Sequence, residues 1–479
     1  QASCLTTAHL MLSEGVVEDG KAHLAWNGTG SQVRLWEHTI RCLAADFQLE
    51  SRFLLIRFLK ELHSFKDMFF DKHPMEIAQE KHNAIEKKRD ELAAKFEAID
   101  EACIPAEQRA QFLYLKGCCY NIMSAYDHRS LECLSKAVKL DPTLIHAWNE
   151  LGECYWKNFN LKEAKVCFEG ALKRDRVTLR SLSILLRQDN SGNQADSTET
   201  ILQSVSHARE AVTMDPTDGQ SWSVLGNAYL CQFFLVAQDP ATLKLALGAY
   251  KQAWLDPIAK GHPDLHYNKG MALKYEESYG EAIESFKMAN RLDPPWDPPV
   301  KELKELVGYL NYIDHLLKNK GKIKAKRILQ MVKSMNQSMF GDYQPGSVVT
   351  FNTQKVMMEH LKLADMQDGE NPGKVVMGRV VGSLHSNNSV PFTFALVDES
   401  MACVAVNVYN WADGRGVIIG DCVAIPEPRV TTHTNNTPYP VYDFRTIRVN
   451  DPTNLRVNGK RVSVNEFAST RVTSTYEAH

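Results

Sequence analysis

With 479 residues the chain is too long for one hydrophobic core, so we expect about two or three domains. Lys and Arg total 55 against 58 for Asp and Glu, and the net charge of −3 excludes a general attraction to polyanions. The hydrophobic fraction of 44% and the charged fraction of 24% are those of an ordinary globular protein.

The eleven cysteines are scattered along the chain without a C-x-x-C pair, which favours reduced, buried thiols over a disulfide framework or a zinc ribbon. The longest apolar run near the start, residues 53–59, is interrupted by Arg57 and is far shorter than the ~18–20 residues that span a bilayer. We therefore expect a cytoplasmic and nuclear protein with no membrane partner.

Residues 1–45 show no clear hydrophobic period and receive no assignment. Residues 46–104 are predicted to form long helices, and the stretch 80–101 is rich in Glu, Lys and Ala. A charged helix of this kind is typical of a solvated cap, so we predict N-terminal capping helices over 46–104.

From residue 105 a pattern of about 34 residues recurs, typical of tetratricopeptide repeats. Its clearest copy contains Trp148, Leu151, Gly152, Tyr155, Ala164, Phe168 and Ala171, and the other copies centre on Gly117, Gly226 and Gly270. Leu-Asp-Pro or Met-Asp-Pro ends second helices at 140–142, 214–216, 255–257 and 292–294, because proline cannot continue a helix. We predict a helical solenoid of about five helix pairs over residues 105–300.

Two irregularities are expected within this solenoid. Eight extra residues separate Tyr229 from Ala246, and we place them in the turn between the two helices of that repeat. The polar stretch 189–198 is predicted to be a loop between the helices of another repeat.

Stacked repeats form a superhelix whose inner surface is lined by the first helix of each pair. Counting along each repeat places Asn149, Glu153, Arg187, Asn227 and Asp264 on that surface. This mixed-charge wall suits an extended peptide that carries charges of both signs. An ordinary solvated face explains the same residues equally well, and Glu153 argues against a clamp for a C-terminal carboxylate.

Residues 301–350 are predicted to form a helix over about 301–317, a basic connector and a linker over 336–350. The connector holds Lys318, Lys320, Lys322, Lys324, Lys326 and Arg327 with no acid among them. Lysines two apart spread around a helix, so the segment offers positive charge in several directions, which suits phosphate backbones. A solvated hinge or a nuclear import signal explains this run equally well.

From residue 373 the period changes to two, and turn residues separate five predicted strands: 373–384, 391–398, 403–411, 420–426 and 442–449. We therefore predict a small barrel of the oligonucleotide/oligosaccharide-binding (OB) type over 351–455, a hairpin turn at Gly414–Gly416 and a polar tail over 456–479. The fold class is mainly α, a solenoid followed by a β-barrel.

Two interpretations of one barrel face stay open. Tyr409 and Trp411 alternate with the apolar residues of the third strand, so exposed rings there, with Arg445 or Arg448, could bind DNA or RNA bases. Packing beneath a loop or against the solenoid is the other interpretation.

No catalytic pattern is present. The chain has no Walker loop, no G-x-S-x-G and no H-E-x-x-H, and its 16 histidines show no metal-ligand spacing. We expect no enzyme activity, no cofactor and no metal.

Longer strings carry a family resemblance. HAWNELGECYWK, SILLRQ, SWSVLGNAYL and KYEESYGEAIESF in the repeats, with VPFTFALVD and GVIIGDCVAIPEP in the barrel, resemble the tetratricopeptide repeat protein 5 (Strap) family over about residues 50–455. The resemblance implies a factor of tubulin autoregulation that binds the Met-Arg-Glu start of nascent tubulin near the ribosomal exit tunnel. It also implies mRNA decay through an adaptor and a deadenylase complex.

The resemblance implies roles for particular residues as well. Residues that match Arg187 and Asp264 contact the nascent peptide in the family, and residues that match Lys324 and Lys326 contact the ribosome. An acidic groove residue of the family aligns with Pro298, and Asp297 beside it is the candidate replacement. The alternative function implied is a nuclear stress-response scaffold for a histone acetyltransferase coactivator.

Overall fold

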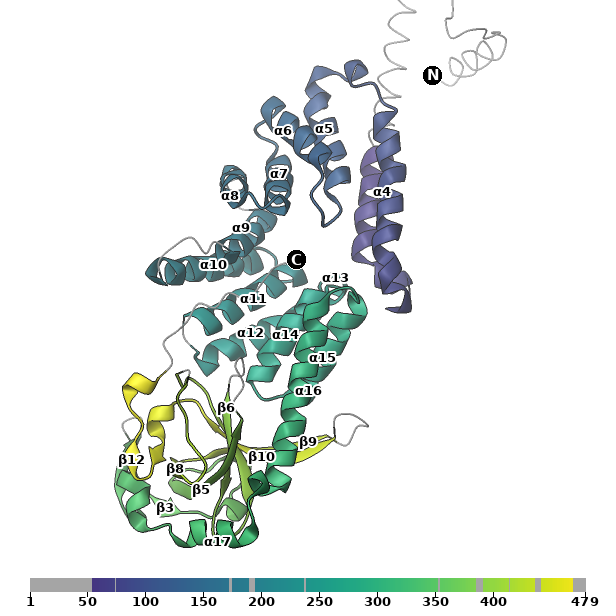
Figure 1. The fold of residues 1–479 in the computed structure, drawn as a ribbon. Coiled ribbons are helices and arrows are strands. Elements are labelled where there is room, and N and C mark those ends of the chain that lie inside the picture. The colour runs from purple at the N-terminus through teal and green to yellow at the C-terminus, as the bar shows by residue number, and fades with distance from the viewer. Residues whose placement is uncertain are drawn as a thin grey trace, which may run out of the picture. The chain divides into compact units, whose positions relative to one another are not determined.

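The computed structural model describes residues 54–73, 75–171, 175–188, 194–236, 238–351, 354–384, 391–412, 414–435 and 441–467. The unassigned stretch 1–45 and the end of the predicted tail lie outside these residues. The chain divides into two compact units, residues 1–60 and 61–479. In the first unit residues 54–60 are helical. The second unit contains the helix pairs and the barrel (Figure 1).

The second unit begins with helical residues 61–67, α3 (Phe69–Lys72) and α4 (Lys81–Glu97). One side of α4 is buried through Ile85, Leu92, Ala93 and Phe96. Phe96 meets Phe112 of α5 edge to face, with ring centroids 5.7 Å apart, and Glu97 accepts a hydrogen bond from Tyr120. The helix therefore covers the first repeat, as expected of a cap.

The described part of the solenoid consists of five helix pairs, which confirms the predicted repeat architecture. They are α5–α6 (Ala106–Asn121, His128–Leu140), α7–α8 (Ile145–Lys157, Leu161–Gly170), α9–α10 (Arg176–Gln188, Gln194–Met214), α11–α12 (Gly219–Leu235, Pro240–Ala253) and α14–α15 (Pro263–Tyr275, Tyr279–Leu292). A Cβ atom on Gly226 would lie 2.5 Å from the Tyr250 ring, so the small residue lets α11 and α12 touch.

The structure of both irregular stretches differs from the prediction. The extra residues between Tyr229 and Ala246 mostly lengthen the two helices, since α11 runs to Leu235 and α12 begins at Pro240. The polar stretch 189–198 is not a loop throughout, because α10 begins at Gln194. A short helix not anticipated, α13 (Pro257–Lys260), starts at the proline expected only to end a helix, with Asp256 capping its first turn.

Helix α16 (Asp297–Lys318) leads from the last repeat to the barrel. The basic connector is not one helix: a short turn, η3 (Lys320–Lys322), with positive φ at each of its residues, separates α16 from α17 (Ala325–Lys333). The predicted linker at 336–350 is wrong, because η4 (Gln337–Tyr343) buries Phe340 and Tyr343 against the barrel.

The barrel has the OB topology. Strands β5 (Lys374–Leu384), β6 (Phe392–Val397) and β7 (Cys403–Val408) form an antiparallel meander, and β7 pairs in parallel with β10 (Tyr442–Val449). β8 (Cys422–Pro426) pairs with β5 and β9 (Arg429–Asn435) pairs with β10. Because β8 and β9 are separated only by residues 427–428, they act as one strand that closes the barrel.

One strand of the barrel was missed, and two expectations about the barrel are wrong. The predicted strand over 420–426 is confirmed as β8, but β9, the other half of the closing strand, was not predicted. Gly414–Gly416 is no hairpin turn, because β7 and β8 pair with other strands. The barrel does not end at 455: β11 (Arg456–Val457) pairs with β8 and with β12 (Lys460–Arg461), so at least residues 456–461 belong to the sheet rather than to a tail.

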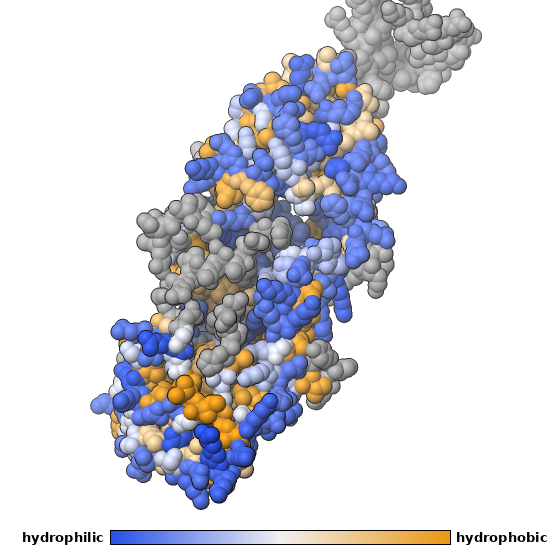
Figure 2. All heavy atoms as spheres, viewed as in Figure 1, coloured by the Kyte–Doolittle hydropathy of each residue, from blue (hydrophilic) through white to orange (hydrophobic). Residues whose placement is uncertain are grey.

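Short strands and turns complete the barrel. A hairpin of β1 (Val348–Phe351) and β2 (Gln354–Met357) precedes β3 (Glu359–His360) and β4 (Gly369–Glu370), which extend its edges. In the view of Figure 2, hydrophilic residues predominate over the helices, and hydrophobic side chains gather on the barrel. No described helix is long and apolar enough to span a membrane.

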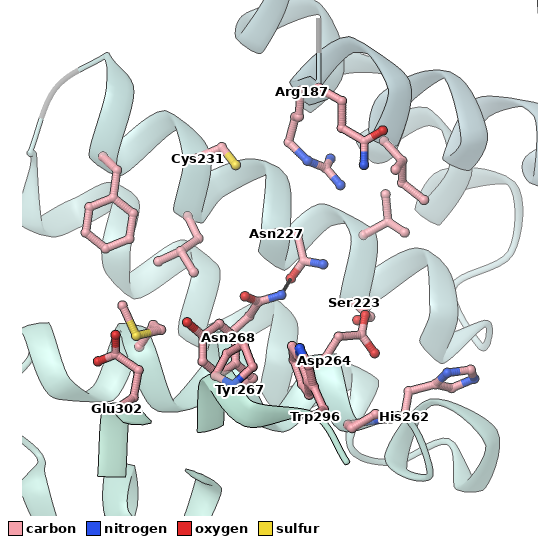
Figure 3. A pocket seen from close by; sticks show the side chains of 18 of the residues that line it. Arg187, Ser223, Asn227, Cys231, His262, Asp264, Tyr267, Asn268, Trp296 and Glu302 are labelled. Carbon is pink, nitrogen blue, oxygen red and sulfur yellow. Dashed lines mark hydrogen bonds between the residues drawn. The ribbon is translucent and has the colours of Figure 1, made fainter. Parts of the chain in front are cut away.

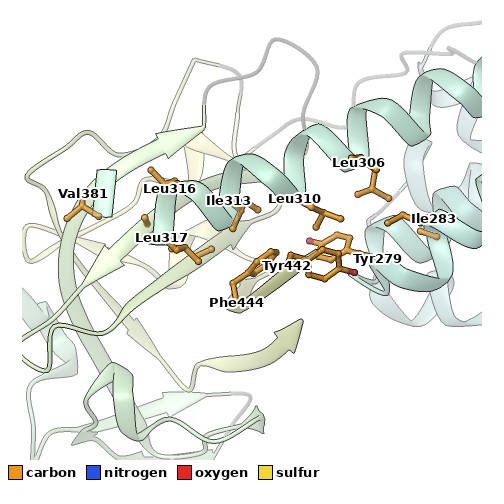
Figure 4. Close-up of a cluster of buried hydrophobic side chains, with 14 of the residues drawn as sticks. Tyr279, Ile283, Leu306, Leu310, Ile313, Leu316, Leu317, Val381, Tyr442 and Phe444 are labelled. Atoms are coloured by element: carbon orange, nitrogen blue, oxygen red, sulfur yellow. The ribbon is translucent and has the colours of Figure 1, made fainter. Parts of the chain in front are cut away.

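The barrel and the solenoid share a hydrophobic core (Figure 4). Leu310, Ile313 and Leu317 of α16 lie over Tyr442 and Phe444 of β10. The cluster also includes Ala395 of β6 and Ala405 of β7 on the outer face of the barrel. Strands two and three of an OB barrel carry the usual ligand face, so in this protein α16 covers that face.

Candidate functional site

A continuous open cavity of about 3740 Å³, which we call the groove, runs along the solenoid. Its wall is formed mainly by the first helices of successive pairs, α7, α9, α11 and α14, and by α16. Residues between 66 and 85, residues 122–126 and residues 410–418 of the barrel also line it. A groove that runs across several parallel helices matches an extended chain rather than a small compact ligand.

Five of the six predicted groove residues line this cavity: Glu153, Arg187, Asn227, Asp264 and Asp297. The sixth, Asn149, does not line it, and its placement in the groove was wrong. Asn149 is buried, donates to Asp175 over 2.8 Å and accepts from Thr178 over 2.7 Å. Its amide holds one repeat to the next, because a buried amide must be satisfied within the protein.

Arg187 is a half-buried cation whose guanidinium points into the groove (Figure 3). It donates only to hydroxyl groups, over 2.8 Å to Ser183 and 3.1 Å to Ser204. Among the described residues no carboxylate lies within ion-pair distance of it. Burial lowers the pKa of Arg187 below its ordinary value, because desolvation disfavours the charged form. An anion that enters the groove would compensate this charge.

Asn227 and Asn268 form a polar step in the middle of the groove. The carbonyl oxygen of Asn227 accepts from Tyr250 over 2.9 Å. It also accepts from Asn268 over 3.0 Å, as Figure 3 shows. Because these bonds use the oxygen of Asn227, its amino group stays directed to other acceptors. A peptide carbonyl is the acceptor that such an amide suits.

Asp264 lies in the first turn of α14, is exposed to the groove and has no ion-pair partner among the described residues. Burial raises the pKa of Tyr250, and the charges of Asp264 and Arg187 act on that hydroxyl with opposite sign. The two charges therefore lie near the same Tyr250–Asn227 hydrogen bond. One groove segment thus offers both a cation and an anion to a ligand.

The other two acidic residues of the groove, Glu153 and Asp297, differ in whether a nearby cation neutralises them. Glu153 is paired with Lys157 over 2.8 Å. Burial alone would raise the pKa of Glu153, but Lys157 and Lys66 outweigh this and lower it. Asp297, in the first turn of α16, is exposed and has no such partner in the described residues. Asp297 is thus the more available of the two carboxylates.

Several groove residues were missed from the sequence, among them Tyr267, Met271 and Lys274 of α14. These stand at the fifth, ninth and twelfth positions of their repeat, so the count that placed Arg187 would have found them. Trp296 also lines the groove, but it follows the last repeat and no repeat position signals it.

Lys324 and Lys326 lie outside the groove, at the start of α17. Both are exposed, as is Arg327, and none has an acidic partner in the part of the chain that the structure describes. Basic residues in a first helical turn add to the positive end of the helix dipole. This cluster therefore carries uncompensated positive charge that suits a polyanion.

For Tyr409 the exposed-aromatic interpretation is wrong, and packing against the solenoid is confirmed. Tyr409 is 3% exposed and donates to Glu277 of the last helix pair over 3.0 Å. Arg448 lies over the Tyr409 ring and donates to the carbonyl of Tyr275. Trp411 packs against Phe392 and faces the groove, and Arg445 donates to the carbonyl of Met366.

The chain is similar to known proteins in both of its parts. A family model described as the tetratricopeptide repeat protein 5 OB fold domain matches residues 357–471, and a tetratricopeptide repeat model matches 145–178 and 263–295. Among solved structures, the tetratricopeptide repeat protein YrrB is 22% identical, covering 43% of this chain and 93% of its own, with a TM-score of 0.29.

Full-length relatives give the stronger likeness. Tetratricopeptide repeat protein 5 of Homo sapiens is 41% identical over 403 residues, which is 84% of this chain and 91% of the human protein. The Mus musculus protein of the same name is 39% identical over 438 residues, 90% of this chain and 99% of its own. At this identity and coverage, the chain belongs to the tetratricopeptide repeat protein 5 family.

Proposed function

We propose that the groove recognises the N-terminal Met-Arg-Glu motif of nascent tubulin, with Arg187 facing the glutamate and Asp264 facing the arginine. The family and its repeats make the chain a protein-interaction adaptor. The observation that carries the finer proposal is the half-buried Arg187 guanidinium, which has hydroxyl partners but no described carboxylate. A partly buried charge of this kind gains most from a ligand of opposite sign.

The position of both charges in one groove supports the assignment of both residues. The charges of Arg187 and Asp264 both act on the Tyr250 hydroxyl, which donates to Asn227, so an extended peptide that crosses this hydrogen bond would meet both charges. The Asn227 and Asn268 amides would hold the peptide backbone between the two charges. Asp297 would take the place of the family acid that aligns with Pro298.

The proposed setting is the ribosome near its exit tunnel. Lys324 and Lys326 would contact ribosomal RNA, and the bound adaptor would promote co-translational tubulin mRNA decay through a decay adaptor and a deadenylase complex. Binding at the cytoplasmic ribosome predicts that the association with tubulin requires ongoing translation. The rival function is a nuclear scaffold for a histone acetyltransferase coactivator, and it predicts chromatin association that does not depend on translation.

The test is crosslinking of the purified full chain to ribosomes that carry nascent tubulin. Arg187→Ala should reduce capture by ~30-fold or more, because it leaves the peptide glutamate unpaired in a partly desolvated site. Asp264→Ala should reduce capture less, because Asp264 is exposed and its ion pair is screened by solvent. Lys165→Ala is the matched control, since Lys165 is an exposed charge on α8 outside the groove.

A second arm varies the nascent chain. Wild type should lose capture when the tubulin start is changed to Met-Glu-Arg, which keeps composition and reverses the order of charge. Equal capture of both starts, or of wild type and the two groove variants, would contradict the proposal. A translation inhibitor separates the rival function, since chromatin association that persists without nascent chains would favour the nuclear scaffold.

A further inference from the structure

Two aromatic rings stand beside the unpaired acids of the groove. Tyr267 lies one helical turn after Asp264 on α14, so both project from the same face of that helix. Trp296 immediately precedes Asp297 at the start of α16. The two ring centroids are 5.0 Å apart, and Figure 3 shows Tyr267, Trp296 and Asp264 gathered at one end of the groove.

Acidic side chains gather at this end of the groove. Burial raises the pKa of Tyr267, and the nearby charges of Glu302 and Glu305 raise it further. Lys274 neutralises Glu302 over 2.8 Å, and Lys301 also lines the groove. Glu305, like Asp264 and Asp297, has no cation within ion-pair distance among the described residues. Three carboxylates that line the groove near the rings therefore have no described partner.

Trp296 contributes a second unsatisfied group. Its indole Nε1 is buried and has no acceptor among the residues that the structure describes. A buried donor without an acceptor carries a desolvation cost that an incoming peptide carbonyl would remove. The two rings and the acids thus suit a ligand group that is cationic and planar and that is attached to a peptide backbone.

We propose that Tyr267 and Trp296 stack on the guanidinium of the bound peptide's arginine and make the groove select arginine over lysine. A guanidinium is planar and weakly hydrated, so it stacks on aromatic rings while its N–H groups reach carboxylates. A lysine ammonium satisfies the acids but is compact and strongly hydrated, and it gains less from the rings. The inference deepens the proposed recognition of Met-Arg-Glu and rests on it.

The experiment measures the affinity of the full chain for labelled tubulin-start peptides by fluorescence anisotropy. The second residue of the peptide is arginine, lysine or citrulline, which keeps the planar shape without the charge. Wild type should prefer arginine over lysine by roughly five- to thirty-fold, and citrulline should bind more weakly than arginine. Tyr267→Leu and Trp296→Leu should each reduce the arginine-to-lysine ratio toward one.

Two further variants separate stacking from folding. Tyr267→Phe keeps the ring and should keep most of the arginine preference. Trp254→Leu is the control, because Trp254 also lies under lysines, Lys260 and Lys269, but outside the groove, and this change should leave the ratio unaltered. Circular dichroism confirms that each variant is folded.

The outcomes distinguish this inference from the function beneath it. If wild type binds Met-Arg-Glu and both leucine variants keep its arginine-to-lysine ratio, the aromatic site is wrong and the proposed function stands. If folded Tyr267→Phe loses the preference as fully as Tyr267→Leu, the tyrosine hydroxyl rather than stacking sets it. If wild type binds none of the three peptides, both proposals fall.

Discussion

The carboxylate of Glu277 lies 3.6 Å from the guanidinium of Arg448, although the two residues belong to the last helix pair and to the barrel. Both side chains are almost fully buried. Glu277 also accepts from Tyr409 and from Thr446, each over 3.0 Å. Its backbone has a φ of 62°, an uncommon conformation for a residue other than glycine. Glu277 thus ties the barrel to the solenoid through several charged contacts.

Removing this carboxylate should destabilise the protein strongly. We expect Glu277→Ala to lower the free energy of unfolding by about 3–5 kcal/mol, because it leaves Arg448 buried without its counter-ion. The neighbouring Glu276→Ala should cost less than about 1 kcal/mol, because Glu276 is more exposed and lies 3.9 Å from Arg429. Urea unfolding of the two variants measures the difference, and equal losses would contradict the role of Glu277.

The carboxyl of Glu150 should make the stability of the protein depend on pH. Burial and the nearby charge of Glu153 raise the pKa of Glu150 to about 7, although Asn121 donates to it over 2.8 Å. A raised carboxyl pKa means that the folded state binds more protons than the unfolded state between pH ~4.3 and 7, so stability falls as the pH rises through this range. Glu150→Gln should remove that fall and stabilise the protein at pH 8 relative to wild type.

Thermal unfolding between pH 5 and 8 checks this prediction. The depressed pKa of Glu277 does not interfere: burial alone would raise it, but His433 and Arg448 outweigh burial, so its contribution is lost only on acidification below about pH 4.3. If the melting temperature changes with pH equally for wild type and Glu150→Gln over pH 5–7, Glu150 is ionised throughout this range and the prediction is wrong.

The basic cluster at the start of α17 should bind through charge alone. Lys324→Glu and Lys326→Glu should weaken ribosome binding more than the corresponding alanine changes, because reversal adds repulsion to the loss of attraction. Binding of the wild type should weaken as salt is added. Affinity for the free tubulin peptide should stay unchanged, because neither lysine lines the groove. Parallel losses of ribosome and peptide binding would indicate a folding defect instead.

Local periodicity explains why the helices and much of the groove could be predicted. Repeat positions fix which helix face turns inward, so Arg187, Asn227 and Asp264 could be placed by counting. The same count misplaced Asn149. Counting identifies the helix face that turns inward, but it does not tell which residues of that face bind the next repeat instead of lining the groove. The tie between Glu277 and Arg448 was beyond sequence reasoning, because its partners are 171 positions apart and no local pattern links them.

The contact between the barrel and the solenoid, which the sequence did not predict, also changes the role expected of Tyr409. Alternation along β7 predicts an outward-facing ring, and the ring does face outward, but the solenoid covers it. We therefore expect Tyr409→Ala to lower the free energy of unfolding by about 3–5 kcal/mol, as for other buried aromatic truncations. Tyr409→Phe should cost only about 1–3 kcal/mol, because it removes one hydrogen bond to Glu277 and keeps the packing.

The covered face should also bind nucleic acid poorly. In fluorescence anisotropy with single-stranded DNA or RNA at physiological salt, the full chain should bind weakly, and Tyr409→Phe should bind no differently. Sub-micromolar binding that Tyr409→Phe or Trp411→Ala abolishes would mean that the barrel opens this face to nucleic acid, and would favour the nuclear function over the ribosomal one.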